Sequence, residues 1–299
     1  MKRRSSSLSP TSLLEVIGLR RILRVPQGAE EWFAFTGFLI VLFIISISIL
    51  APFISPYDPT KPYSGPALQP PSFEYPFGTN LLGMDMLSRI IWGGRFILLI
   101  ALASATFSMI IGTPLGLISG YFGGKLDRVL SVIMDSIYAF PGLILAIALT
   151  AMLGPSMLNV IVAISVIYIP TFFRMVRSVV LSVKEEAFVE AGRALGASSF
   201  TIIFRYIFPS TLPNIVVIFS LCVADAILTE AGLAFIGLSP ISPPTPDWGY
   251  DLYAGWQMLI GGYWWLVLFP GIFITLTVLG FALIGEGLNE LYNPLLRER

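Results

Sequence analysis

The sequence predicts an all-helical protein that crosses a membrane six times. Only 12% of its 299 residues are charged, about half of the roughly 25% that is usual in soluble domains, while 56% are hydrophobic. Several uncharged runs reach the roughly 20 residues that a helix needs to cross a bilayer. The chain therefore falls in the class of polytopic membrane proteins. Its formal net charge of zero gives no reason to expect a nucleic-acid partner.

The first span is expected at residues 32–52, because Trp32 to Leu50 is a run of nineteen residues without a charge. Residues 1–31, which precede it, are basic and polar. A signal peptide is the alternative for this end, but the apolar run is too long for one and lacks a clear cleavage site. Residues 53–90 are expected to form an external loop, because their proline density forbids a long helix before residue 77.

The second span is expected over 91–120, where small residues line up on one side of the helix. They recur every four positions: Ser104, Ser108, Gly112, Gly116 and Gly120. Small residues allow two helices to approach closely in lipid. The stripe therefore predicts tight packing of this span against a neighbouring helix.

Four more spans are expected within residues 91–290. The run from Ser136 to Phe173 contains thirty-eight residues without a charge, which is too long for one span and right for two. Gly154-Pro155 divides it. The predicted spans are 129–152, 157–180, 212–237 and 263–285, with a loop at 181–212 and a short tail at 291–299. Pro141 and Pro170 are expected to kink the first two of these spans.

The positively charged residues predict which side of the membrane holds the two ends. Six spans place both termini on one side. Of the eighteen lysines and arginines, three (Lys61, Arg89 and Arg95) would lie on the opposite side and fifteen on the side of the termini. Positive charge favours the cytoplasmic side, so both termini and the loop at 181–212 are expected in the cytoplasm.

The loop between the fourth and fifth spans is the longest polar run in the second half of the chain. Helical spacing places apolar residues on one face, namely Ala187, Phe188, Ala191, Ala194 and Leu195. Such a face favours either docking into a groove on another protein or lying on the lipid headgroups. Glu186 and Glu190 add an acidic edge, since they lie four residues apart.

Capping signals divide this loop into two short helices. Ser182 and Glu185 have the spacing of a capping box ahead of the first helix. Gly196 is expected to end it, and Ser198 or Ser199 to cap a second helix. Pro209 and Pro213 would then stop the second helix and begin a membrane span.

Residue types narrow the possible chemistry. The chain has no histidine, which removes the usual metal ligand and neutral-pH proton carrier, so metal catalysis is not expected. The single cysteine, Cys222, lies in an apolar run and is read as packing. Asp225 and Glu230 lie inside the fifth span, where acids are costly and often functional. They could line a translocation path, or form ion pairs within the bundle with Arg174 or Arg177; otherwise these arginines would extend to the lipid headgroups.

The polar loop resembles the EAA loop of inner-membrane permease subunits of ATP-binding-cassette (ABC) importers. Glu190-Ala191-Gly192, Gly196 and Pro209 match its motif. Gly192 replaces the second alanine of that motif, and Phe208 replaces its usual leucine. In the family this loop carries the helix that couples the permease to its ATPase.

Three further stretches resemble the C-type permease of dipeptide and oligopeptide importers. They are PFGTNLLGMDMLSRIIWGGR at 76–95, LAFIGLSPISPPTPDWGYDL at 233–252 and FALIGEGLNELYNP at 281–294. Asn80, Met84 and Asn289 stand where the family has charged residues, and Glu286 replaces an aspartate. The similarity runs from about residue 35 to residue 295.

The resemblance implies a type I ABC importer permease fold in the cell membrane and a translocation path for peptides or oligosaccharides, with nickel as another cargo of the family. It implies three kinds of partner: a second homologous permease in a heterodimer, two cytoplasmic ATPase subunits and an external solute-binding protein. ATP and magnesium would bind to the ATPase subunits, so this chain would bind no cofactor and would not be an enzyme. The implied coupling residues are Glu186, Phe188, Glu190, Ala191, Gly192, Leu195 and Gly196. Asp225 and Glu230 would serve the path or its gate.

Two other functions compete with this interpretation. An ion-coupled secondary transporter would be expected to show an internal repeat with paired broken helices, and none is evident. An intramembrane enzyme would need a nucleophile or metal constellation, for which only a pair such as Asp135 and Asp225 could be suggested.

Overall fold

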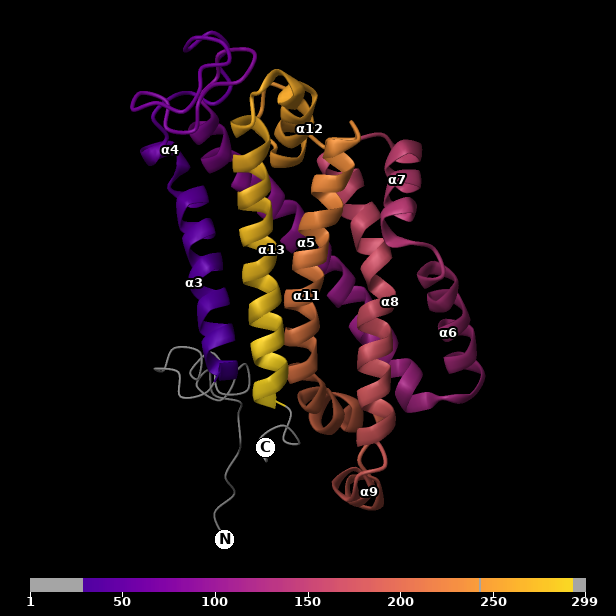
Figure 1. Ribbon diagram of the computed structural model, residues 1–299. Helices are drawn as coiled ribbons and strands as arrows, with labels where there is room; N and C mark the ends of the chain where they lie inside the picture. Colours follow the sequence, from indigo (N-terminus) through magenta and orange to yellow (C-terminus); the bar gives the residue numbers. More distant parts are fainter. Residues whose placement is uncertain (1–28, 242, 293–299) are drawn as a thin grey trace.

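The computed structural model describes residues 29–241 and 243–292 as a bundle of long helices (Figure 1). The helices of the bundle are α3 (Ala29–Ile49), α5 (Met86–Phe122), α8 (Met157–Val183), α11 (Phe208–Phe235) and α13 (Trp265–Tyr292). Their order in space follows from packing: α3 lies beside α13, α13 beside α11, and α11 beside both α5 and α8. Five helices in the described residues are long and apolar enough to cross a membrane.

The sixth span is broken. Helices α6 (Gly124–Tyr138) and α7 (Gly142–Leu153) meet at an angle of 87° and make one span only when counted together. The prediction of a single kinked helix at 129–152 was therefore wrong, because the span is broken into two separate helices. Pro141 is the N-cap of α7 and has no amide hydrogen to continue α6, so the chain turns there. Both halves lie at the edge of the bundle (Figure 1).

The small-residue stripe of the second span packs against α8, as predicted. A side-chain carbon at Gly112 would lie 2.6 Å from the carbonyl oxygen of Ile169, a distance that real structures do not tolerate. Next to it, the hydroxyl of Ser108 donates a 2.8 Å hydrogen bond to the carbonyl of Ser165 on α8. Close helix approach in lipid depends on small side chains of this kind. The stripe therefore fixes the α5–α8 pair within the chain.

The fifth span begins earlier than predicted. The chain is helical without interruption from α10 (Ser199–Thr201) through a π-helical segment, η1 (Ile202–Ile207), into α11. Pro209 and Pro213 therefore do not stop a short helix, and that prediction was wrong. Pro209 has no amide hydrogen to donate to the preceding turn, and the wider π-helical turn just before it shifts the hydrogen-bond register so that the helix continues.

One end of the bundle carries a compact cap, which comprises residues 50–85, 236–241 and 243–264. It contains α4 (Ala51–Ile54), α12 (Trp248–Met258) and the short η2 (Leu259–Gly261). The Trp248 indole is buried and donates a 2.8 Å hydrogen bond to the carbonyl of Ile90. Gly93 gives it room, since a side-chain carbon there would lie 2.6 Å from the indole ring. The cap is thereby seated directly on the start of α5.

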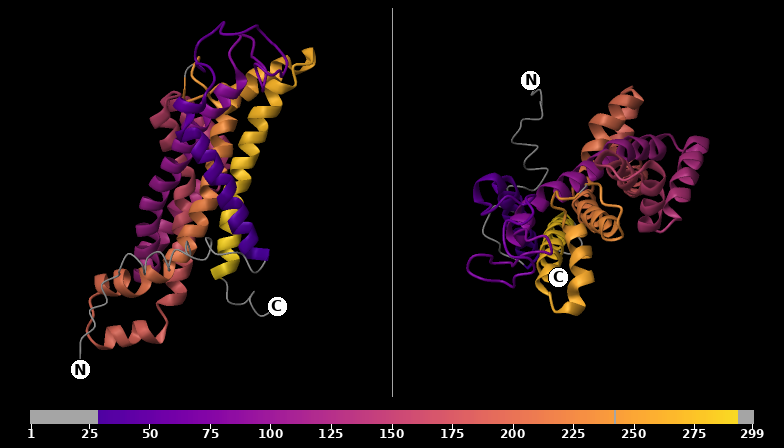
Figure 2. Two further views of the ribbon diagram at one scale, coloured as in Figure 1. Left: turned by 90° about the vertical axis from the view of Figure 1, so that its left-hand side faces the viewer. Right: turned by 90° about the horizontal axis from the view of Figure 1, so that it is seen from above.

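The opposite end carries α9 (Ala187–Ala194) and η1. Figure 2 shows that α9 and the beginning of the fifth span project beyond the parallel helices of the bundle. We refer to residues 184–207 as the α9 segment. The two ends of the molecule thus differ in how far their connections are packed onto the bundle.

Candidate functional site

Helix α9 is closed at its C-terminal end by a glycine turn, as predicted. Gly196 has φ of +77°, a left-handed conformation that residues with a β-carbon rarely adopt. The amide of Ala197 donates to the carbonyl of Gly192 at 3.1 Å, and the amide of Gly196 donates to that of Arg193 at 2.9 Å. These two bonds form a Schellman motif. A side-chain carbon at Gly196 would touch nothing within 4 Å, so the requirement there is conformational.

The N-terminal end of α9 differs from the prediction. Ser182 lies inside α8, which extends to Val183, so it cannot form a capping box with Glu185. Glu186 is the residue that precedes α9, with extended φ and ψ of −72° and 143° and no side-chain capping bond. Glu190 in the first turn and Arg193 in the last have the charges that suit the helix dipole. Ser198 does cap α10, because its hydroxyl accepts from the amide of Thr201.

The predicted apolar face of α9 points away from the bundle. Val189 and Gly192 are the buried residues of this helix, and Gly192 faces the ring of Tyr206 in η1. Phe188 is 46% exposed and Leu195 is 88% exposed. Ala191 and Glu190 are exposed on the same projecting helix. The candidate coupling residues therefore form a surface of mixed apolar and acidic character, except for Gly192, which packs inward.

Phe200 and Phe204 extend this apolar surface onto the start of the fifth span. They are 70% and 49% exposed, and their ring centroids lie 4.5 Å apart. Sequence analysis missed them because it considered the apolar face of the first short helix of the loop and not that of the second. Large exposed apolar surfaces mark sites of protein or membrane contact.

The α9 segment is joined to the C-terminal end of α5. The guanidinium of Arg193 lies 5.5 Å from the centre of the Tyr121 ring, and the hydroxyl of Tyr121 donates to that of Ser199 at 3.4 Å. The amine of Lys184 also donates to the carbonyl of Gly120 at 3.2 Å. Both arms of the segment thus hold the same helix end.

The broken span is tied to the same place by Asp127. Its carboxylate accepts two hydrogen bonds from Arg177 of α8 and one from the hydroxyl of Ser119 of α5. Arg174 of α8 pairs with Asp135 of α6 at 2.7 Å and lies 3.9 Å from the centre of the Tyr138 ring. The alternative that these arginines pair with the acids of the fifth span was therefore wrong, because their partners are Asp135 and Asp127 of α6. The α9 segment, α5 and α6 are thus joined by a continuous set of contacts.

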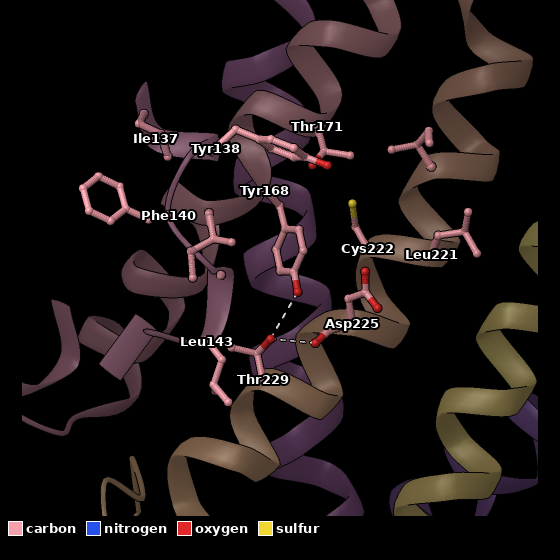
Figure 3. A pocket seen from close by; sticks show the side chains of 13 residues that line it. Ile137, Tyr138, Phe140, Leu143, Tyr168, Thr171, Leu221, Cys222, Asp225 and Thr229 are labelled. Atoms are coloured by element: carbon pink, nitrogen blue, oxygen red, sulfur yellow. Dashed lines mark hydrogen bonds between the residues drawn. The ribbon is translucent and has the colours of Figure 1, made fainter. Parts of the chain in front are cut away.

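A partly open cavity of about 530 Å³ lies where α6 gives way to α7 (Figure 3). Its walls come from the broken span, α8 and α11, and they combine apolar side chains with hydroxyl groups and one carboxylate. The hydroxyl groups of Tyr168 and Thr229 lie 3.1 Å apart on one wall, and that of Thr229 donates to the carbonyl of Asp225 at 2.8 Å. The carboxylate of Asp225 points into the same space (Figure 3).

The two acids of the fifth span are in different surroundings. Asp225 is exposed to the cavity, whereas Glu230 is 1% exposed and is not part of the cavity wall. One carboxylate oxygen of Glu230 has no hydrogen-bond partner. Asp225 is thus the one of the two that a solute in the cavity could contact. No three potential metal-ligating side chains come together in residues 29–241 and 243–292.

Comparisons with known proteins agree with one another. Residues 112–298 match the family model described as "Binding-protein-dependent transport system inner membrane component", and residues 31–71 match the "N-terminal TM domain of oligopeptide transport permease C". The chain is 42% identical over 270 residues to the dipeptide transport system permease protein DppC of Alkalihalophilus pseudofirmus, covering 90% of this chain and 88% of that protein.

Two further relatives and one solved structure extend the comparison. The chain is 40% identical to the glutathione transport system permease protein GsiD of Pectobacterium atrosepticum, covering 87% of this chain and 86% of that protein. It is 36% identical to the di/tripeptide transport system permease protein DppC of Pseudomonas aeruginosa, covering 88% of each chain. A crystal structure of the MetNI methionine ABC transporter in an inward-facing conformation contains a chain with the same fold. It is 22% identical with a TM-score of 0.52, covering 67% of this chain and 96% of that one.

Proposed function

This chain belongs to the family of binding-protein-dependent transport system inner membrane components, and we propose that the solute it carries is a short peptide. It is a permease subunit of an ATP-driven ABC importer, a transport component and not an enzyme. The family model covers well over half of the chain, and its described helices include five span-length helices and one broken span.

The names of the relatives are the reason to propose peptides rather than oligosaccharides or nickel as the solute. They are named for dipeptides, di/tripeptides and glutathione, at 36–42% identity over almost the whole chain. A peptide has a charged amine, a carboxylate and apolar side chains, and the cavity beside Asp225 offers both polar and apolar walls. This combination supports the same class of solute.

We further propose that the α9 segment docks on a cytoplasmic ATPase subunit. Its exposed Phe188 and Leu195 provide an apolar contact, and Glu190 provides a charged one. A second, homologous permease would pair with this one, covering the exposed apolar side chains of α6 such as Val129, Val132 and Ile133. Two ATPase subunits and an external binding protein would complete the importer. ATP and magnesium would then bind to the ATPase subunits, with no cofactor on this chain.

The proposed orientation places the α9 segment and both termini in the cytoplasm and the cap outside. Among the described residues, the end that bears α9 carries Lys125, Arg128, Lys184, Arg193 and Arg205, whereas the cap end carries Lys61, Arg89 and Arg95. An excess of positive charge is typical of the cytoplasmic side. In a Cys222→Ser background, cysteines placed at 65 or 245 should react with an impermeant thiol reagent added outside, and a cysteine at 190 should not. Labelling at 190 from outside would reverse the orientation.

In this mechanism, closure of the ATPase subunits moves the α9 segment. The contacts of Arg193, Lys184 and Ser199 pass that motion to the inner end of α5, and Asp127 passes it to α6. The broken span forms one wall of the cavity, so its movement changes access to the solute. Binding energy at one site is thereby coupled to the conformation at the other.

The function is tested with the whole importer in proteoliposomes, with its binding protein. Dipeptides and tripeptides should be taken up only when ATP is present on the side of the membrane that bears the ATPase subunits. Maltotriose and nickel serve as the competing solutes. Uptake that continues without ATPase subunits, driven by an ion gradient, would instead favour a secondary transporter.

A further inference from the structure

Within residues 29–241 and 243–292, the carboxylate of Asp225 has no counter-ion. No ion pair joins it to any of the described residues, and the hydrogen bond that Thr229 makes to this residue ends on its backbone carbonyl. The two arginines of the neighbouring α8 are already paired, Arg174 with Asp135 and Arg177 with Asp127. A lone carboxylate in a spanning helix is costly unless it faces water or a partner.

The rest of the cavity adds oxygen atoms that suit an ammonium group. Helix α6 ends at Tyr138 and α7 begins at Gly142 on the same cavity wall, so the partial charges of the two helix ends offset each other and the Asp225 carboxylate determines which charge the cavity favours. The hydroxyl groups of Tyr168 and Thr229 provide further oxygen atoms, while Leu143 and Leu221 make the surroundings apolar. A metal cation would need several oxygen ligands at once, whereas an ammonium group is served by one carboxylate and a few hydroxyls.

From this geometry we infer that the cavity is a transit site for the protonated amine of the solute, with Asp225 as its counter-ion. The inference rests on the proposed function and deepens it, because it assigns the end of the peptide that this subunit recognises. The volume of about 530 Å³ falls within the roughly 300–1,000 Å³ typical of small-ligand sites. Broken helices also line the substrate sites of other transporters.

The first test measures the charge of the cavity without relying on transport. Thr171 lies on the α8 wall of the cavity, and Thr171→Cys in a Cys222→Ser background provides a single thiol there. In the assembled complex, a cationic thiol reagent should react faster than an anionic one of the same size. Asp225→Asn should lower that rate ratio about tenfold, as expected for the loss of a unit charge a few ångströms away in partly hydrated surroundings.

The matched control is Glu286→Gln, which removes an exposed carboxylate from α13, away from the cavity wall. It should leave the rate ratio unchanged. If Asp225→Asn also leaves it unchanged, the cavity is not electrostatically set for a cation and the inference fails. Loss of the second permease from the purified Asp225→Asn complex would instead identify this carboxylate as a subunit contact, which also overturns the inference.

The second test uses uptake of one tripeptide in two forms, with a free or an acetylated amine, each supplied already bound to its binding protein. Asp225→Asn should lower uptake of the free-amine form about tenfold relative to the acetylated form, and Asp225→Glu should restore the ratio. An equal loss for both forms would mean a structural role and would overturn the inference. If the parent complex imports no peptide, the proposed function fails, while the thiol rate ratio still decides the cavity.

Discussion

At the cap, a buried charged side chain is paired and hydrogen-bonded, whereas the α9 segment leaves large apolar side chains exposed. Arg89 is 2% exposed, and its guanidinium donates to the carboxylate of Asp251 as well as to the carbonyls of Pro59 and Pro244. One side chain thus joins α5, both cap loops and α12. The α9 segment has no such anchor among its exposed residues.

This difference shows how the chain divides its stability from its partner contacts. A buried ion pair is tolerated only when its geometry and its additional hydrogen bonds offset desolvation, and the cap provides both. Exposed residues such as Phe188 and Leu195 contribute little to the fold of the single chain, but they can contribute to an interface. Substitutions in the cap should therefore affect folding, and substitutions in the α9 segment should affect coupling.

The largest effect is expected for Arg89→Met. It leaves Asp251 buried without its partner, which typically costs about 3–5 kcal/mol. Burial already raises the pKa of the Asp251 carboxyl and Arg89 opposes that rise, so removing Arg89 favours the protonated form. We expect a large drop in the yield of folded protein and in the melting temperature of the purified complex.

Arg95→Met is the matched control, because Arg95 is exposed and stacks on Trp92 outside this network. It should fold like the parent. The double variant Arg89→Met/Asp251→Leu removes both charges and should recover part of the loss. Normal folding of Arg89→Met would show that the cap does not depend on its ion pair, and the contrast between the two ends would be lost.

The second effect concerns the turn at Gly196. Gly196→Val places a β-branched residue in a left-handed conformation, at a cost of about 1–2 kcal/mol, which corresponds to roughly a five- to thirtyfold change in an equilibrium. We expect the complex to assemble, while peptide uptake falls by about that factor and ATP hydrolysis loses its response to loaded binding protein.

Gly196→Asn is the control here, since asparagine adopts the left-handed conformation more readily than other residues with a side chain. It should retain most of the activity. If Gly196→Val transports like the parent at equal complex yield, the geometry of this turn is irrelevant to coupling.

Sequence reasoning predicted the periodic elements well and the long-range pairs poorly. The small-residue stripe and the Gly196 turn follow from local spacing, so both were predictable. Asp127 and Arg177 are fifty positions apart, and Arg89 and Asp251 still further, so only the three-dimensional structure pairs them. The helical continuity through Pro209 depends on a π-helical turn that has no clear signal in a single sequence.

The candidate site also has one part that local spacing predicts and one part that depends on long-range contacts. Residues of the α9 segment share one short helix, so their spacing predicted a common surface. The cavity instead brings together α6, α7, α8 and α11, and the 87° bend that opens it could not be inferred from one proline. As a result, Asp225 and Glu230 were treated as equivalent, although only Asp225 reaches the cavity.

The smallest effect is expected for Glu190→Lys, and it sharpens the contrast most because it changes an exposed charge and no buried contact. Glu190 lies in the first turn of α9, so lysine there also loses a helix-dipole interaction of about 0.3–1 kcal/mol. Glu190→Gln separates the two contributions, since it removes the negative charge without adding a positive one. Glu185→Lys controls for a new positive charge in the turn just before α9. We expect binding-protein-stimulated ATP hydrolysis to fall severalfold for Glu190→Lys, less for Glu190→Gln and little for Glu185→Lys.

Because a surface contact is screened by salt over about 8 Å at physiological ionic strength, the difference between lysine and glutamine at 190 should shrink when salt is raised. A loss of activity that is equal for all three variants, or independent of salt, would mean that Glu190 makes no charged contact with the ATPase subunit.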